Sequence, residues 1–183
     1  MMSCREEILT PKPRGYFKIE LPKKSYTSFN QENYPYEFEF PVYGKIEKDS
    51  MFFDKKAENP WWINIDFPSI GGKIYLSYKE INTGSNNLKK LLEDSYTLSY
   101  YHTKKADYIK DPIFHTANNV HGIYYDVGGN SASAFQFYAT DSVKHFLRGA
   151  LYFDVTPNAD SLKPYNKFLR EDIIHLVESL KWK

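Results

Sequence analysis

Residues 120–155 read VHGIYYDVGGNSASAFQFYATDSVKHFLRGALYFDV. The segment holds three runs rich in aromatic and β-branched side chains, which favour strands because they pack well on a pleated surface; the runs are 120–127, 132–140 and 146–155. Gly128-Gly129-Asn130 predicts a tight hairpin turn, since Gly and Asn tolerate positive φ, and Asp141-Ser142 is a weaker turn signal. Both connections are too short for a crossover, so the segment predicts three consecutive antiparallel strands.

The rest of the chain adds strands and two helices to this unit. Alternating or apolar runs predict further strands at 36–43, 62–67, 73–79 and 113–116, whereas the charged segment 45–59 predicts a loop. A helix is predicted from 88 to about 104, with one face formed by Leu88, Leu91, Leu92, Ser95, Leu98 and Ser99. A second helix is predicted from about 160 to 181. The fold class is therefore α+β, a mostly antiparallel sheet flanked by helices.

Length and composition indicate one domain behind a short tether. The chain has 183 residues, within the range of a single domain. Residues 1–24 are polar and contain prolines that oppose regular structure, so we predict a tether over 1–24 and a single α+β domain over 25–183. No apolar stretch approaches the roughly 18 residues that span a bilayer. A net charge of +1 argues against a nucleic-acid partner.

The sequence contains no motif of a known catalytic or cofactor site. We find no nucleophile elbow, P-loop, dinucleotide-binding glycine pattern or zinc-protease motif, so we expect no catalytic residues and no cofactor. The single cysteine excludes a disulfide framework, and no two of the five histidines have the spacing that places two ligands on one helix face, so we expect no metal. Asp66, on the polar side of a predicted strand, indicates a solvated carboxylate.

Two polar clusters are candidates for binding a partner. The first, at the predicted end of the first helix, contains His102 and Asp107; its alternative explanation is that Lys and His favour the negative end of a helix dipole. The second surrounds the turn at 141–142 and contains Gln136, Thr140, Asp141, His145 and Arg148. Arg148 lies in an apolar strand, where an arginine either extends to the edge or is held by a carboxylate. An Arg–Asp pair bracing the turn is the structural alternative to recognition.

The chain resembles the GldD family of lipoproteins, which is associated with gliding motility in the Bacteroidetes group. The resemblance covers nearly the whole chain after the tether, and residues 145–153 (HFLRGALYF) are its most specific part. The other matching stretches are 13–17 (PRGYF), 62–68 (WINIDFP), 76–79 (LSYK), 92–95 (LEDS), 102–107 (HTKKAD), 136–137 (QF), 140–142 (TDS), 157–158, 160–161, and the closing stretch from 171 to 183.

The resemblance implies an envelope lipoprotein linked to surface motility and to type IX secretion, with no catalytic residues. It gives Cys4 the role of lipid attachment, since Ser3-Cys4 precedes a proline-containing tether; the alternative is an ordinary surface thiol. The implied location is the cell envelope, facing the periplasm and anchored to a membrane. By the order of its strands and helices the chain also resembles PsbP-like domains, in which helices sandwich an antiparallel sheet.

Three functional hypotheses follow. The leading hypothesis is a non-catalytic binding or assembly factor whose partners are envelope proteins of a motility or secretion complex. The second is an enzyme acting on an envelope component, with His102 or His145 as base and Asp66 or Asp141 in support; these groups would have to converge in a pocket. The third is a carrier of a small ligand, which needs a closed apolar cavity between sheet and helix.

Overall fold

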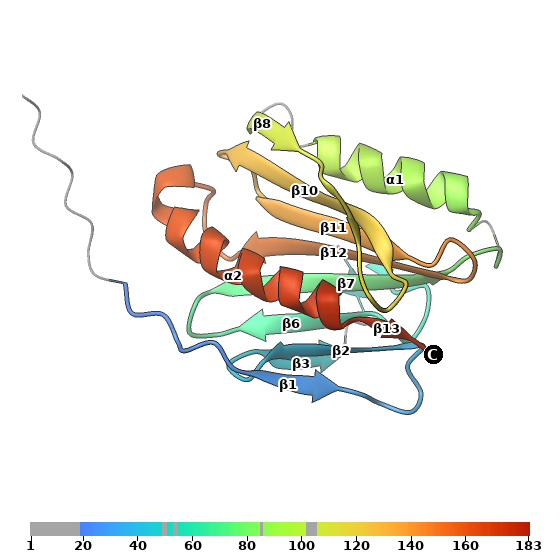
Figure 1. Ribbon diagram of the computed structural model, residues 1–183. Coiled ribbons are helices and arrows are strands. Elements are labelled where there is room, and N and C mark those ends of the chain that lie inside the picture. The colour runs from blue at the N-terminus through green and yellow to red at the C-terminus, as the bar shows by residue number, and fades with distance from the viewer. Residues whose placement is uncertain (1–18, 49–50, 53–54, 85, 102–105) are drawn as a thin grey trace, which may run out of the picture.

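An eight-stranded antiparallel sheet forms the centre of the protein, with one helix on each face (Figure 1). The computed structural model describes residues 19–48, 51–52, 55–84, 86–101 and 106–183. The sheet has the order β3-β6-β7-β12-β11-β10-β8, and β9 also pairs with β10. Its strands are β3 (Lys45–Lys48), β6 (Ile63–Phe67), β7 (Gly72–Glu80), β8 (Ala106–Lys110), β9 (Ile113–His115), β10 (His121–Gly129), β11 (Phe135–Thr140) and β12 (His145–Phe153). The predicted α+β class is confirmed.

The three strands predicted over 120–155 are the centre and one side of this sheet. β10 pairs with β11, and β11 pairs with β12, both antiparallel, with Gln136 opposite Ala150. β12 then pairs along its whole length with β7, from His145 opposite Glu80 to Phe153 opposite Gly72. The strands predicted at 62–67 and 73–79 are also present, and they form a hairpin because β6 pairs antiparallel with β7.

The pairing register separates the side chains of the sheet into two faces. Since successive side chains of a strand point to opposite faces, Leu147 and Leu151 share one face with Ile74 and Leu76. Arg148 lies on the other face, opposite Ser77 and Tyr138. We name these the α2 face and the α1 face, after the helix that covers each.

Helix α2 (Ala159–Ser179) closes the apolar core on the α2 face. Asn158 caps its N-terminus by accepting a hydrogen bond from the backbone N–H of Ser161. Its buried residues are Leu169, Asp172, Ile173, Leu176 and Val177. A three-stranded sheet of β1 (Tyr26–Phe29), β2 (Tyr36–Pro41) and β13 (Lys181–Trp182) completes this side, and Phe29, Tyr36 and Phe38 join the same core.

Helix α1 (Leu88–Tyr100) covers the α1 face more thinly. Asn87 caps it by accepting from the backbone N–H of Lys90. Only Leu91, Ser95 and Ser99 of the helix are buried. Leu98, predicted on the buried face, is 51% exposed, so that part of the prediction was wrong.

The structure adds strands that the sequence did not predict, and most of them lie at sheet edges. β1, β3 and β8 are edge strands, and β3 falls in the segment predicted as a loop. Such strands keep most side chains exposed, so they carry no apolar alternation. The same segment holds the short pair β4 (Met51–Phe52) and β5 (Lys55–Lys56). The second helix ends at Ser179 rather than 181, because the chain turns there into β13.

Candidate functional site

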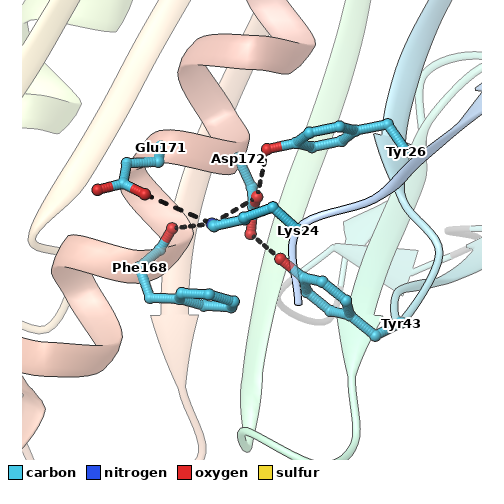
Figure 2. A network of polar contacts seen from close by, with 6 residues as sticks. All are labelled: Lys24, Tyr26, Tyr43, Phe168, Glu171 and Asp172. Atoms are coloured by element: carbon cyan, nitrogen blue, oxygen red, sulfur yellow. Dashed lines mark hydrogen bonds and ion pairs between the residues drawn. The ribbon is translucent and has the colours of Figure 1, made fainter. Parts of the chain in front are cut away.

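A polar network joins the start of the described chain to helix α2 (Figure 2). The Asp172 carboxylate is fully buried, and its Oδ1 accepts from Lys24 Nζ at 2.6 Å and from Tyr26 Oη at 2.9 Å. Asp172 Oδ2 accepts from Tyr43 Oη at 2.6 Å. Lys24 Nζ also donates to the carbonyl of Phe168 at 2.6 Å. All three donors to Asp172 are therefore provided by segments that precede the central sheet.

This network fixes the point at which the predicted tether meets the body. Burial, together with the bonds to Asp172, raises the pKa of the Tyr26 and Tyr43 hydroxyls, so both remain neutral donors. A buried carboxylate is tolerated only when it is paired and hydrogen-bonded, as here. Lys24, the last residue of the predicted tether, thus belongs to the folded part. Cys4 lies outside the described residues.

The sequence contains a signal for this network, although it was not among the predicted site residues. Asp172 lies between Leu169 and Ile173 in the apolar stripe of the second helix. A carboxylate at such a position indicates a buried partner, because an unpaired buried charge is very costly. The identity of the partners depends on contacts more than 120 residues away in sequence, such as Tyr43, and periodicity carries no information on them.

On the α1 face, Arg148 is held by an amide rather than by a carboxylate. Its Nη2 donates to Gln136 Oε1, which also accepts from Ser99 Oγ at 3.3 Å. Gln136 is fully buried. Among the described residues, Arg148 Nε and Gln136 Nε2 are buried without a hydrogen-bond partner. The Arg–Asp pair considered as an alternative does not form, since Asp141 is bonded to the backbone of its own turn.

A groove of about 320 Å³ runs between α1 and the sheet beside Arg148. Its walls combine apolar side chains with polar groups and two cations; the lining residues are Trp62, Ser77, Lys79, Leu91, Asp94, Ser95, Thr97, Leu98, Phe146 and Arg148. A second groove of about 360 Å³ lies on the other side of α1, between Tyr96 on the helix and Ile123 and Tyr138 on the sheet. The α1 face is thus incompletely filled on both sides of its helix.

Thr140 and Asp141 shape the turn that joins β11 to β12. Asp141 Oδ1 accepts from the backbone N–H groups of Val143, Lys144 and His145 at 2.8–2.9 Å. Burial by itself would raise the pKa of this carboxyl, but the three backbone hydrogen bonds outweigh it and lower the pKa. Thr140 Oγ1 donates to the His145 carbonyl at 2.6 Å. Both side chains stabilise the turn in this structure.

His145 lies on the α2 face, away from Arg148. The residue is 5% exposed, its Nδ1 is 2.8 Å from the hydroxyl of Tyr78, and its ring stacks on Trp182 at 5.1 Å between ring centroids. Burial lowers its pKa, so the imidazole is neutral at ordinary pH. His145, one of the two bases named in the enzyme hypothesis, is therefore enclosed by aromatic rings.

The seven predicted contact residues are thus divided among several places. Gln136, Thr140 and Arg148 share the α1 face, Asp141 lies at the turn, and His145 lies on the α2 face. Asp107 is exposed on β8, and His102 lies outside the described residues. Their part in partner binding stays a prediction, but the described ones do not form one exposed surface.

Of the groups proposed for an enzyme, Asp141 lies beside His145 and accepts a hydrogen bond from its backbone N–H, whereas Asp66 and His145 do not converge. Asp66 lies opposite Lys73, on the α1 face, with 3.5 Å between its Oδ1 and Lys73 Nζ. His145 lies on the opposite face of the same sheet. Within the described part of the chain, no group of three or more His, Cys, Asp or Glu side chains is arranged to hold a metal ion. Nor does that part contain a helix long and apolar enough to cross a membrane.

A group of exposed apolar side chains on and just after α1 was not predicted from the sequence. Tyr96 is 52% exposed, Leu98 51% and Tyr101 74%. Tyr96 stacks on Tyr100 with 4.1 Å between ring centroids, which extends an aromatic surface along the helix. The high aromatic content was a signal for such a surface, but it is also typical of strands, and composition cannot separate the two.

The sequence of the chain matches a known protein family, and its fold matches a solved structure. The family model described as gliding motility lipoprotein GldD matches residues 6–182. No curated protein matches the chain. The solution structure of cyanobacterial PsbP (CyanoP) from Synechocystis sp. PCC 6803 is similar over 89% of this chain and 95% of its own, with a TM-score of 0.50 and 12% identity. At that identity the likeness shows the fold alone, and it confirms the predicted PsbP-like arrangement.

Proposed function

Because the chain belongs to the family of the gliding motility lipoprotein GldD, we propose that it is a binding and assembly factor of a motility or type IX secretion complex. The match over residues 6–182 supports a membrane-anchored envelope lipoprotein. In this proposal the body faces the periplasm and a lipid on Cys4 holds it at a membrane. Its role is to bind a partner protein rather than to catalyse a reaction.

The observation that carries the proposal is the exposed apolar surface of α1. Tyr96, Leu98 and Tyr101 are each more than half exposed, and Tyr96 also lines the second groove. Exposed aromatic side chains such as Tyr96 and Tyr101 are typical of protein–protein contact surfaces. On the α2 face, by contrast, the apolar side chains of the core are enclosed by α2 and the small sheet.

The Asp172 network supports the anchoring half of the proposal. Nineteen residues lie between Cys4 and Lys24, so the distance from one to the other is at most about 70 Å. Asp172 and the Phe168 carbonyl hold the ammonium group of Lys24 and so tie the segment around it to α2.

The experiment is capture of partners from the native cell envelope. The full-length anchored protein is purified after mild cross-linking, and the proteins that accompany it are identified by mass spectrometry. We expect a component of a motility or secretion complex, and we expect the double substitution Tyr96→Ser, Tyr101→Ser to reduce its recovery about ten-fold. Loss of two aromatic contacts commonly has an effect of that size or larger.

The matched control replaces two exposed apolar side chains elsewhere. Val42 is 55% exposed and Val155 58%, and neither lies on α1. The double variant Val42→Ser, Val155→Ser should capture the partner as the wild type does. Equal recovery with both double variants, at equal protein levels, would contradict the α1 surface. Capture of no envelope component by the wild-type protein would contradict the proposed function itself.

The predicted cluster around Arg148 stays a second candidate contact. Gln136, Thr140 and His145 are each at most 5% exposed, and of this cluster Arg148 alone lines the groove beside α1. The substitution Arg148→Ala tests this contact. Intact partner capture at normal protein levels would count against it.

A further inference from the structure

Arg148 is a cation placed where the described part of the fold provides no anion for it. Arg148 is partly buried, with its Nε fully enclosed, and its Nη2 hydrogen bond goes to the neutral amide of Gln136. No ion pair within the described residues includes Arg148. A buried arginine is normally paired with a carboxylate or phosphate, because its desolvation is otherwise uncompensated. Asp172 differs from Arg148, because a lysine and two tyrosine hydroxyls donate hydrogen bonds to its carboxylate.

The titratable groups nearest to Arg148 do not supply the missing charge. Its electrostatic neighbours are the phenols of Tyr125 and Tyr152. Burial raises the pKa of Tyr125 to about 12 and raises the pKa of Tyr152 above its ordinary value, so both are neutral at physiological pH. Burial also lowers the pKa of the Arg148 guanidinium, which remains protonated because an arginine starts so high.

The groove beside Arg148 has the composition of a site for an amphipathic anion. Trp62, Leu91, Leu98 and Phe146 give it apolar walls, and Lys79 is a second cation in its lining. Lys79 Nζ is paired with Glu58 at 2.8 Å, whose side chain is about half exposed. The groove also includes the exposed carboxylate of Asp94, on the side of the helix. The buried side is therefore the positive side, and the solvent side carries the acid.

We infer that this groove binds a carboxylate carried on a short apolar chain, with Arg148 as the charged partner and the apolar walls holding the stem. A planar guanidinium suits a carboxylate, because two of its N–H groups can form parallel hydrogen bonds with the two carboxylate oxygens. The volume of about 320 Å³ is at the small end for ligand sites, so the stem is of medium length. The site adjoins the proposed partner surface at Leu98, but Tyr96 and Tyr101 do not line this groove.

Two sources can supply this chemistry: a free medium-chain acid, or the C-terminal carboxylate of a polypeptide that ends in apolar residues. The experiment uses the full chain and isothermal titration calorimetry. The probes are octanoate, its uncharged counterpart octanol, and a short peptide ending in Leu-Phe with a free or an amidated C-terminus. Octanoate binding without peptide binding assigns the free acid, and binding of only the free-carboxylate peptide assigns a chain terminus.

The expected result is binding of at least one carboxylate probe that falls about ten-fold or more in the variant Arg148→Gln. Loss of a charge-assisted bond of this type commonly amounts to at least that factor. The variant Arg170→Gln is the matched control, because Arg170 is a surface arginine of α2 that pairs with Asp126 and lies over the Phe135 ring. Its affinity should equal that of the wild type.

Arg148→Lys serves as a second variant, should the amide substitution disturb the fold. This variant keeps the positive charge but removes the planar guanidinium group, so we expect an affinity between those of the wild type and Arg148→Gln. Octanol binding as tightly as octanoate would overturn the inference, as would equal octanoate affinities in wild type and Arg148→Gln. Absence of measurable binding by every carboxylate probe would also overturn it, while leaving the partner surface on Tyr96 and Tyr101 untouched.

Discussion

The helices on the two faces of the central sheet bury very different sets of side chains. Against the α2 face, Leu169, Ile173, Leu176 and Val177 are each at most 1% exposed. Against the α1 face, the buried residues of the helix are one leucine and two serines, with a groove on either side. Buried apolar area stabilises by about 25 cal/mol per Å². The α2 face therefore supplies most of the stability, and the α1 face leaves surface available for ligands and partners.

The charged groups on the two faces differ in the same way. Asp172 on the α2 side accepts three side-chain hydrogen bonds at 2.6–2.9 Å. Arg148 on the α1 side has one amide partner and a buried Nε without a partner among the described residues. A buried charge with a complete set of hydrogen-bond partners can be part of the stable fold. A buried charge with an incomplete set lowers the stability of the fold unless a ligand supplies the missing partner.

The largest expected difference comes from truncating one leucine on each face. Leu169→Ala should lower the free energy of unfolding by about 4 kcal/mol, because it removes transfer energy and leaves a closed cavity. Leu91→Ala should cost about 2 kcal/mol, because Leu91 already borders an open groove that the helix can partly fill. Urea unfolding of both variants measures the two values. Equal losses would mean that α1 is packed as tightly as α2, and the comparison would fail.

The next effect tests the buried carboxylate that ties the N-terminal segment to α2. Asp172→Ala should cost about 3 kcal/mol, since it leaves Lys24 and two tyrosine hydroxyls without their acceptor. The cost stays below that of a fully buried pair because the Lys24 side chain is 27% exposed and regains water. Amide hydrogen exchange should rise in residues 19–29.

Glu171→Gln is the control for that substitution. Glu171 lies 3.9 Å from Lys24 Nζ and its side chain is 57% exposed, so screening by water leaves little interaction to lose. Its free energy of unfolding should match the wild type to within about 0.5 kcal/mol. A loss as large as that of Asp172→Ala would show that general charge around Lys24, rather than the Asp172 bonds, holds the segment.

A smaller effect is expected at the turn between β11 and β12, which belongs to neither helix. Asp141→Ala should cost about 1–2 kcal/mol at neutral pH, because three backbone N–H groups lose their acceptor. The folded-state pKa of Asp141 is lowered, so its contribution is present above about pH 4, the unfolded value. The contribution disappears as the pH falls through the lowered pKa.

Urea unfolding of wild type and Asp141→Ala over a pH series measures this dependence. The difference between the two proteins should be constant from neutral pH down to about pH 5 and shrink below about pH 4. Asp154→Ala, an exposed carboxylate after β12, should show no such pH-dependent difference. A gap that grows on acidification would contradict the assignment of the backbone hydrogen bonds as the cause.

The central strands could be predicted from the sequence because each has a buried face. β10, β11 and β12 are aromatic-rich and separated by recognisable turns, and each is found within a few residues of its predicted bounds. The edge strands β1, β3 and β8 could not be predicted, because a strand that buries little has no reason to alternate. The sequence therefore predicts the central strands best, and the apolar pattern that indicates a strand weakens toward the edges of the sheet.

The site was less predictable than the fold, because it depends on which face each residue takes. Arg148 could be singled out, since a charge in an apolar strand requires an explanation. Its partner could not, because the pairing of Gln136 with Ala150 places the amide, rather than Asp141, beside the guanidinium. Leu98 shows the same limit: helical periodicity placed it on the buried stripe, but the open grooves beside α1 leave it half exposed.

The smallest expected effect is that of Ser99→Ala on the α1 face, and the reverse exchange on the α2 face is its comparison. Ser99→Ala should change the free energy of unfolding by no more than about 0.5 kcal/mol, because a long 3.3 Å bond to Gln136 is lost while a better helix former is gained. The reverse exchange on the α2 face, Ala139→Ser, should cost about 1–3 kcal/mol, because it buries a hydroxyl in the closed core. Urea unfolding of both proteins makes the comparison. A loss above about 1 kcal/mol for Ser99→Ala would mean that polar contacts, rather than loose packing, hold α1 on the sheet, and that the groove beside Arg148 is more rigid than its composition indicates.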